Sequence, residues 1–295
     1  MQDKEPDEFR DSHALRDIWL LFRRDRIALF SFYIFAWLVL ITVFSPLFAP
    51  YGSDAQFVGK ELLPPSWVSD GTVAYFFGTD DIGRDVFSRL IQGTRYTFGG
   101  AIIVVFFTAL VGGILGIIAG MSQGMKARIL GHFLDAFLVI PILLIAIIIA
   151  TLMQPSLFNA MLAISLALLP QFIHEIYQAV QKELKKEYVL TMRLDGASNR
   201  TLLKEAILPN ISVHYIREIS KAFTIALLDI SALSFISLGA QRPMPEWGAM
   251  IRDSLELIYL APWAVILPGL AIVVSILVTI VLGNGLCKAI EKYYE

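Results

Sequence analysis

The sequence predicts an all-α integral membrane protein with six transmembrane helices and one large cytoplasmic loop. Composition, a series of apolar runs and an uneven distribution of positive charge support this prediction. Of 295 residues, 56% are hydrophobic and 17% are charged, and the mean hydropathy is +0.66. Soluble domains are about 45–50% apolar and about 25% charged, so much of this chain must face lipid. The net charge of −2 indicates no nucleic-acid partner.

The first apolar run, residues 27–49, follows a polar segment, residues 1–26. It is long enough to cross a hydrocarbon core of about 30 Å and longer than the apolar region of a cleavable signal peptide. We therefore expect it to be an uncleaved transmembrane helix that ends at Pro46 or Pro50, because proline lacks the backbone N–H. The same criterion predicts helices at residues 27–49, 98–120, 136–153, 157–173, 222–240 and 263–286.

Positive charge predicts the orientation of these helices. Of 24 lysines and arginines, all but six fall in the N-terminal segment, the connections on its side of the membrane, and the C-terminal end. The six on the opposite side are Lys60, Arg84, Arg89, Arg95, Arg242 and Arg252. Cytoplasmic segments are enriched in Lys and Arg, so both termini and the loop at residues 174–217 should be cytoplasmic.

Within that loop, residues 187–210 have the pattern of two short amphipathic helices joined at Asp195-Gly196. Glycine tolerates the positive φ of a tight turn. Ser198 or Asn199 is suited to cap the second helix, and Pro209 to end it. Periodicity alone fits either an ordinary cytoplasmic loop or an element that docks on a partner.

Two segments on the outer side carry further candidates. Asp80, Asp81 and Asp85 lie near Arg84 and Arg89, so either a calcium loop or a set of ion pairs is conceivable, and their spacing does not fit an EF-hand.

The second outer segment, residues 241–262, is proline-rich around Trp247. A tryptophan in such a loop suits an anchor at the membrane interface or a partner-docking surface equally well.

Within the membrane, Gly112, Gly116, Gly120 and Gly124 recur at every fourth position. This spacing is typical of close helix packing, within the subunit or against a partner. Asp229 lies in the middle of an apolar run, where a carboxylate is costly unless it faces the bundle interior or a water-filled path. It is a candidate pore-lining group, or alternatively a polar contact between helices.

The sequence carries no catalytic constellation of a membrane enzyme and no phosphate-binding loop, so we expect neither enzyme activity nor ATP hydrolysis by this chain. We also expect no cofactor and no metal. The single cysteine, Cys287, excludes an internal disulfide and a cysteine-based metal site. We expect it to be an apolar packing residue.

Three motifs carry a family resemblance. They are FGTDDIGRDVFSR at residues 77–89, LGAQ followed by PEWG within residues 238–248, and GAS at residues 196–198 with ILPN at residues 207–210. Together they resemble permease subunits of the dipeptide, oligopeptide and nickel ABC transporters. The family's Glu-Ala-Ala triplet is replaced by Leu190-Thr191-Met192, and its isoleucine position is Ala206. These departures change one of the coupling contacts that the resemblance implies.

Five further segments resemble the Sap-type branch of C permeases, a branch associated with handling antimicrobial peptides: residues 62–67, 187–189, 193–197, 228–230 and 256–263. The resemblance implies a type I ABC importer permease fold in a bacterial inner membrane. It implies a second homologous permease, two ATPase subunits and a periplasmic substrate-binding protein as partners, besides membrane lipid.

The resemblance also implies half of a pore for peptide-like or cationic solutes, driven through ATPase-coupling contacts at Tyr188, Gly196, Ala197, Leu203, Leu208 and Pro209. The alternative is a secondary transporter or channel driven by an ion gradient. Such a transporter usually shows inverted repeats and broken helices, and we see no repeat.

Overall fold

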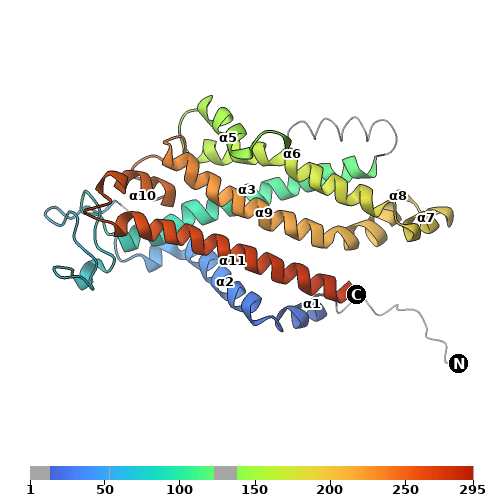
Figure 1. Cartoon of the computed structure of the whole chain (residues 1–295), viewed down its shortest axis with the longest axis horizontal. Coiled ribbons are helices and arrows are strands. Elements are labelled where there is room, and N and C mark those ends of the chain that lie inside the picture. Colours follow the sequence, from blue (N-terminus) through green and yellow to red (C-terminus); the bar gives the residue numbers. More distant parts are fainter. Residues whose placement is uncertain (1–13, 53, 123–137, 295) are drawn as a thin grey trace.

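The computed structural model describes residues 14–52, 54–122 and 138–294, and every named element within them is helical. Long helices run side by side along one axis (Figure 1). Two ends of the bundle differ. One end, here the loop end, carries residues 49–52 and 54–85 and α10 (Trp247–Ser254). The opposite end, here the α7 end, carries α7 (Glu187–Leu194) and α8 (Asn199–Thr201).

Five helices make up most of the bundle: α2 (Arg26–Phe48), α3 (Val86–Met121), α6 (Leu157–Glu183), α9 (Leu208–Phe235) and α11 (Trp263–Tyr294). In the described part of the chain, four of these are long and apolar enough to cross a membrane, namely α2, α3, α6 and α11. α5 (Ile142–Thr151) is apolar but shorter. α9 is long, yet its first half contains Arg217, Glu218 and Lys221.

The helices extend well beyond the apolar runs that predicted them. α3 begins at Val86 and not near residue 98, because the Asp85 carboxylate accepts the Ser88 N–H at 2.8 Å and caps the helix there. α6, α9 and α11 likewise continue past their apolar runs at the α7 end. The expected loop at residues 174–217 is therefore mostly helical. Of the run at residues 136–153, α5 covers Ile142–Thr151, and residues 136–137 lie outside the described part.

Of the predicted helix ends, the one near Pro50 is confirmed, since α2 ends at Phe48, whereas those at Pro46 and Pro209 are wrong. Pro46 lies inside α2, where Phe44 has a non-helical φ/ψ of −107° and 17°, so the helix kinks and continues to Phe48. Pro209 lies in the first turn of α9. It follows a π-helical stretch, η2 (Leu202–Ile207), and proline is tolerated in a first turn because its missing N–H has no helical partner there.

The segment expected to be only polar, residues 1–26, contains a helix over its described part, α1 (Ala14–Phe22). Phe22 is buried with Ala28 of α2 and with Leu282 and Ala289 of α11. Hydropathy missed this helix because its nine residues are too few to cross a membrane and include Arg16 and Asp17.

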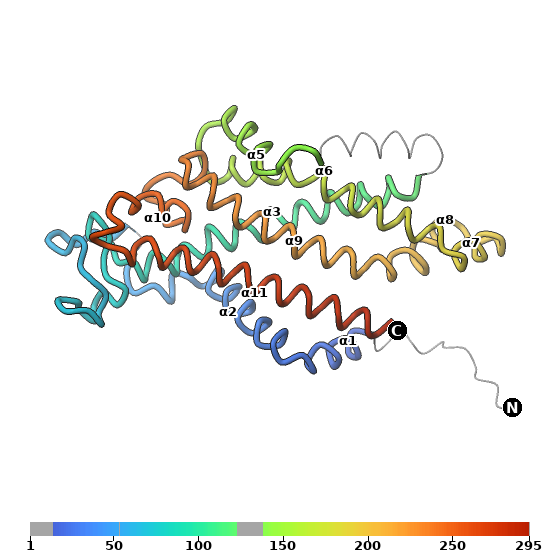
Figure 2. Tube along the Cα trace, viewed as in Figure 1, coloured from blue at the N-terminus to red at the C-terminus, as the bar shows by residue number. Residues whose placement is uncertain are grey.

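The most extensive packing among the described helices joins α3 to α6, which the backbone trace also shows side by side (Figure 2). A Cβ added at Gly116 would lie 2.7 Å from the Ile176 Cβ, and one at Gly120 would lie 2.6 Å from the Val180 Cβ. Gly112 faces Phe172 in the same way, at 3.0 Å. These three glycines therefore form a packing face within the subunit, and Gly124 lies outside the described residues.

Candidate functional site

The turn after α7 has a defined geometry. Gly196 has φ +85°, its N–H donates to Arg193 O at 3.1 Å, and the Ala197 N–H donates to Met192 O at 2.9 Å. This is the Schellman arrangement, in which a residue with positive φ closes a helix C-terminus. The sequence predicted the turn at Asp195-Gly196, and the structure explains why glycine is needed at that position.

The second short helix begins where one of the two capping candidates predicted. The Ser198 hydroxyl accepts the Thr201 N–H at 3.2 Å. From there η2 leads into α9 without a break, and its Leu202, Ala206 and Ile207 side chains are at most 1% exposed in the main hydrophobic core. The α7 end is therefore anchored in the bundle, although it protrudes beyond the other helices (Figure 1).

The six predicted coupling residues all lie at this end. Tyr188 and Leu208 are about two-fifths exposed, at 40% and 41%. Gly196 is exposed, and Ala197, Leu203 and Pro209 are partly buried. The residues with the most prominent apolar exposure are two that sequence reasoning did not select, Leu190 at 47% and Leu194 at 87%.

A hydrogen-bonded cluster lies at the base of α7. The Tyr188 hydroxyl donates to Glu183 Oε1, and Asn210 Nδ2 donates to the Tyr188 oxygen at 3.0 Å. Lys186 Nζ lies 2.9 Å from the second Glu183 oxygen. Burial, followed by the Glu183 carboxylate, raises the pKa of Tyr188 above its ordinary value. Sequence reasoning missed Glu183 and Asn210, because only folding brings them to Tyr188.

At the loop end, the acidic residues of the first outer segment pair with arginines or accept hydrogen bonds from backbone N–H groups. Asp80 Oδ2 lies 2.6 Å from Arg84 Nε and 3.7 Å from Arg89 Nε, and Asp80 Oδ1 accepts the Arg84 N–H at 2.8 Å. Asp85 caps α3. Among the described residues, no group of three or more His, Cys, Asp or Glu could hold a metal ion. The ion-pair interpretation accounts for this segment.

Both interpretations of Trp247 are wrong, since its side chain is only 1% exposed. Its Nε1–H donates to Leu90 O at 3.0 Å, and its indole lies over Gly93, where an added Cβ would be 2.6 Å away. Trp247 anchors α10 to α3 inside the subunit. The signal in the sequence was Gly93, whose missing side chain leaves room for the indole.

Glu246, the residue before Trp247, is completely buried. Its carboxylate accepts hydrogen bonds from the Thr97 hydroxyl at 2.8 Å, the Ser231 hydroxyl at 3.3 Å and the Ala249 N–H at 2.9 Å. These partners belong to α3, α9 and α10. Burial raises the pKa of Glu246 despite these hydrogen bonds. Glu246 thus holds three helices together at the loop end.

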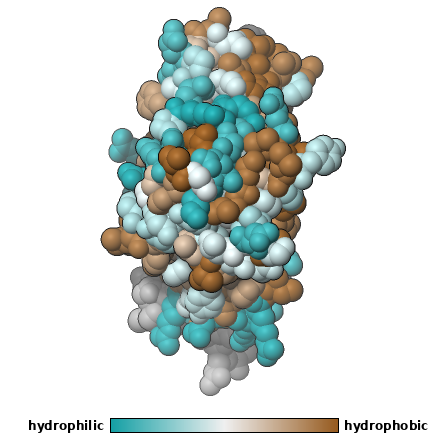
Figure 3. Space-filling model, turned by 90° about the vertical axis from the view of Figure 1, so that its left-hand side faces the viewer, coloured by the Kyte–Doolittle hydropathy of each residue, from teal (hydrophilic) through white to brown (hydrophobic). Residues whose placement is uncertain are grey.

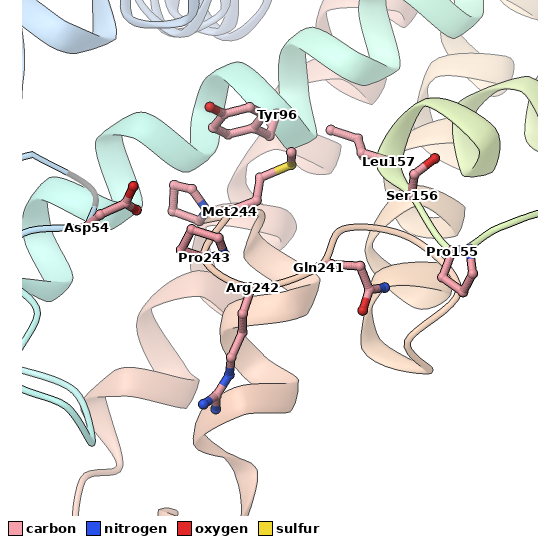
Figure 4. Close-up of a pocket in the computed structure, with 10 residues that line it drawn as sticks. Asp54, Tyr96, Pro155, Ser156, Leu157, Gln241, Arg242, Pro243 and Met244 are labelled. Carbon is pink, nitrogen blue, oxygen red and sulfur yellow. The ribbon is translucent and has the colours of Figure 1, made fainter.

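A cavity of about 370 Å³ opens beside this contact. It is bordered by Tyr96 of α3, the turn between α5 and α6, and residues 241–245, while the Arg242 side chain points away from it (Figure 4). Arg242 instead pairs with Asp253 at 2.8 Å. Seen from this end, the surface mixes hydrophilic and hydrophobic residues (Figure 3).

Asp229 lies in the second half of α9, distant along the helix from Asn210 but two residues before Ser231, whose hydroxyl donates to Glu246. It is 6% exposed, and its Oδ2 has no hydrogen-bond partner among the described residues.

Comparisons with known proteins now decide the family. Residues 112–293 match the family described as "Binding-protein-dependent transport system inner membrane component". Residues 14–65 match the "N-terminal TM domain of oligopeptide transport permease C". The chain belongs to the family of binding-protein-dependent transport permeases.

Relatives of this permease match it over more than nine-tenths of their length. It is 62% identical to the "Peptide transport system permease protein SapC" of Haemophilus influenzae, over 100% of both chains. It is 49% identical to the SapC protein of Escherichia coli, over 96% of each. It is 35% identical to the "Di/tripeptide transport system permease protein DppC" of Pseudomonas aeruginosa, over 94% of this chain and 91% of that one.

The permease also shares its fold with a chain of the MetNI methionine ABC transporter in inward-facing conformations. The TM-score is 0.55 at 13% identity, over 68% of this permease and 96% of that chain. The permease is therefore a multi-pass inner-membrane subunit of an ABC transporter with a type I importer fold, and its resemblance to the Sap-type branch is confirmed.

Replacing Glu246 tests its role in holding the loop end. Glu246→Leu leaves Thr97, Ser231 and Ala249 without their acceptor, and each unsatisfied buried group costs about 1–3 kcal/mol. We expect a lower unfolding temperature in mild detergent. Glu246→Gln keeps an acceptor oxygen and should lose less, so equal losses in the two variants would contradict the role.

Wild type and Glu246→Gln should also differ in how their stability depends on pH. The pKa of Glu246 is raised in the folded state, so its protonated form is favoured by folding. Wild-type stability should therefore rise relative to Glu246→Gln as the pH falls from above the folded pKa toward the unfolded one. A pH-independent difference between the two unfolding temperatures would show that the pKa of Glu246 is the same in the folded and unfolded states.

Proposed function

We propose that this permease forms one half of a translocation pore for peptides, with a second homologous permease as the other half. Two ATPase subunits would drive it, and a periplasmic binding protein would deliver the solute. The full-length identity of 62% to a peptide permease carries the substrate class. The coupling role is supported by α7, which exposes Leu190 and Leu194 while its Val189 is buried in the core. Together they favour a transporter powered by partners that bind nucleotide.

We propose six spans, with α9 and the apolar run at residues 136–153, which contains α5, added to the four apolar helices. α9 has 28 residues, which is about 42 Å at roughly 1.5 Å per residue and enough to cross. Arg217, Glu218 and Lys221 would then have to face protein or water, since charged side chains rarely face lipid. On this proposal α9 borders the water-filled path.

We place both termini and the α7 end in the cytoplasm. All but six of the 24 lysines and arginines lie on that side in the six-span topology, which is the asymmetry expected of cytoplasmic segments. The loop end then faces the periplasm, where a binding protein would reach it.

Two exposed positions test this orientation by labelling with a maleimide that cannot cross the inner membrane. Val58→Cys, 94% exposed at the loop end, should be modified in cells whose outer membrane has been made permeable. Leu208→Cys, at the α7 end, should react only after the inner membrane is also broken. Native Cys287 is buried and serves as the unlabelled background. The opposite pattern would invert the proposed topology.

We propose that α7 and η2 seat on an ATPase subunit. A short helix with an apolar face binds in a groove of its partner, and Leu190 and Leu194 supply that face. Leu190 stands where the family triplet has glutamate, so the contact at this position would be apolar in this permease. Tyr188, Gly196, Ala197, Leu203, Leu208 and Pro209 would shape and support the element.

A charge on the proposed docking face should uncouple the transporter. Leu194 is 87% exposed, so Leu194→Glu should leave folding intact while it places a carboxylate in an apolar contact. In the reconstituted complex we expect loss of ATPase retention, or about tenfold less solute moved per ATP. Val58→Glu, an equally exposed change at the loop end, is the matched control. Normal ATPase retention and transport in Leu194→Glu would contradict the docking proposal.

We propose that Asp229 contributes negative charge to the path and favours cationic solutes. Its burial, its unbonded Oδ2 and its place on α9 support this role. Asp229→Asn removes the charge and keeps the shape, so uptake of labelled trilysine should fall more than uptake of labelled trialanine. Equal effects on both peptides would instead indicate a packing contact between helices.

A further inference from the structure

Three side chains from three helices meet at the base of α7. Glu183 is the last residue of α6, Tyr188 lies in the first turn of α7, and Asn210 lies in the first turn of α9. Their polar atoms form a chain, since Asn210 Nδ2 donates to the Tyr188 oxygen at 3.0 Å and the Tyr188 hydroxyl donates to Glu183 Oε1. The three residues therefore join the end of α6, the first turn of α7 and the first turn of α9 directly through their side chains.

The chemistry of this chain of hydrogen bonds is self-consistent. The second hydrogen of the Asn210 amide goes to Ala206 O at 2.7 Å, so both N–H groups are used and the side-chain orientation is fixed. Glu183 is only 6% exposed, and its second oxygen is held by Lys186 Nζ at 2.9 Å. A hydrogen bond to a buried carboxylate is among the stronger kinds. The pKa of Tyr188, raised from an ordinary value that is already well above neutral, leaves its hydroxyl protonated, and so a donor, at neutral pH.

The two ends of α7 are held very differently. Next to Tyr188, Val189 is 0% exposed and belongs to the main core. At the far end, Gly196 has nothing within 4 Å of the position of its missing Cβ, and Leu194 is 87% exposed. A force applied near Leu194 therefore acts on a helix that is fixed at its first turn.

We propose that Glu183, Tyr188 and Asn210 form a latch that ties the first turn of α7 to α6 and α9 at once, so that α7 and α9 move as one body. This inference rests on the proposed docking of an ATPase at α7. The three are positioning residues. Their hydrogen bonds transmit displacement from α7 into α9, the helix that carries Asp229 and extends toward the loop end.

Distance measurements between two nitroxide labels test the latch without knowledge of the solute. The labels replace Asp195, after α7, and Leu228, which is 46% exposed on α9, in a Cys287→Ala background. The complete transporter, with both permeases and both ATPases, is measured without nucleotide and after trapping with ATP and vanadate. The distance should be the same in both states with the latch intact. Tyr188→Phe removes the shared hydroxyl and should broaden the trapped distribution about twofold.

Tyr215→Phe is the matched control. Tyr215 also donates a hydrogen bond between helices, to Ala109 O at 2.7 Å, but it lies away from α7. It should lower the unfolding temperature and leave the distance unchanged. Asn210→Ala provides a second way to break the latch if Tyr188→Phe folds poorly, and should broaden the distribution equally.

Three results would overturn the latch: a distance that changes with nucleotide in the intact protein, no broadening in Tyr188→Phe and Asn210→Ala, or equal broadening in Tyr215→Phe. Failure of the docking proposal is recognised separately. If Leu194→Glu retains the ATPases and stays coupled, α7 is not the docking element. If Leu194→Glu uncouples while both latch variants match the intact protein, docking stands and only the latch is wrong.

Discussion

The close contact between α3 and α6 is the constraint on which the rest of the permease depends. Gly112, Gly116 and Gly120 let the two backbones approach so closely that a single methyl group would collide with Ile176 or Val180. In lipid, helix association relies on such packing, because apolar side chains gain little by leaving one apolar environment for another. This contact fixes the position of α6 against α3, and with it the position of Glu183 at the base of α7. It also fixes α3, whose other half receives Trp247.

The two ends of the bundle then use opposite physical solutions. At the loop end, Glu246 and Trp247 bury their polar atoms against α3 and α9. Within the first outer segment, Arg84 pairs with Asp80. Buried and satisfied hydrogen bonds make such a region rigid. At the α7 end, by contrast, apolar Leu190 and Leu194 are left in solvent while Val189 secures the same helix to the core. Exposed apolar residues on an anchored helix are suited to a partner.

Much of the α7 end was predictable because its signals are local. Gly196 marks a turn that requires positive φ, and Ser198 is a suitable cap three residues before the N–H it accepts. Trp247 was misassigned because its burial depends on Gly93, which is far away in the sequence. Glu183 and Asn210 were missed for the same reason. Helix lengths were underestimated because hydropathy detects contact with lipid, whereas α3 and α9 continue as helices through polar residues.

α9 shows why hydropathy underestimates the length of some helices in this permease. A span that contacts only lipid must be apolar around its circumference, whereas a span that borders water or another subunit need not be. α9 has buried apolar residues such as Ile211, Ala226 and Leu233, but it also carries Lys221, which lies 3.6 Å from Glu175 on α6. Its mixed character follows from its position, with one face in the core and another that lipid would not tolerate. On the proposed six-span topology, these charged residues in the first half of α9 face protein or water and not lipid.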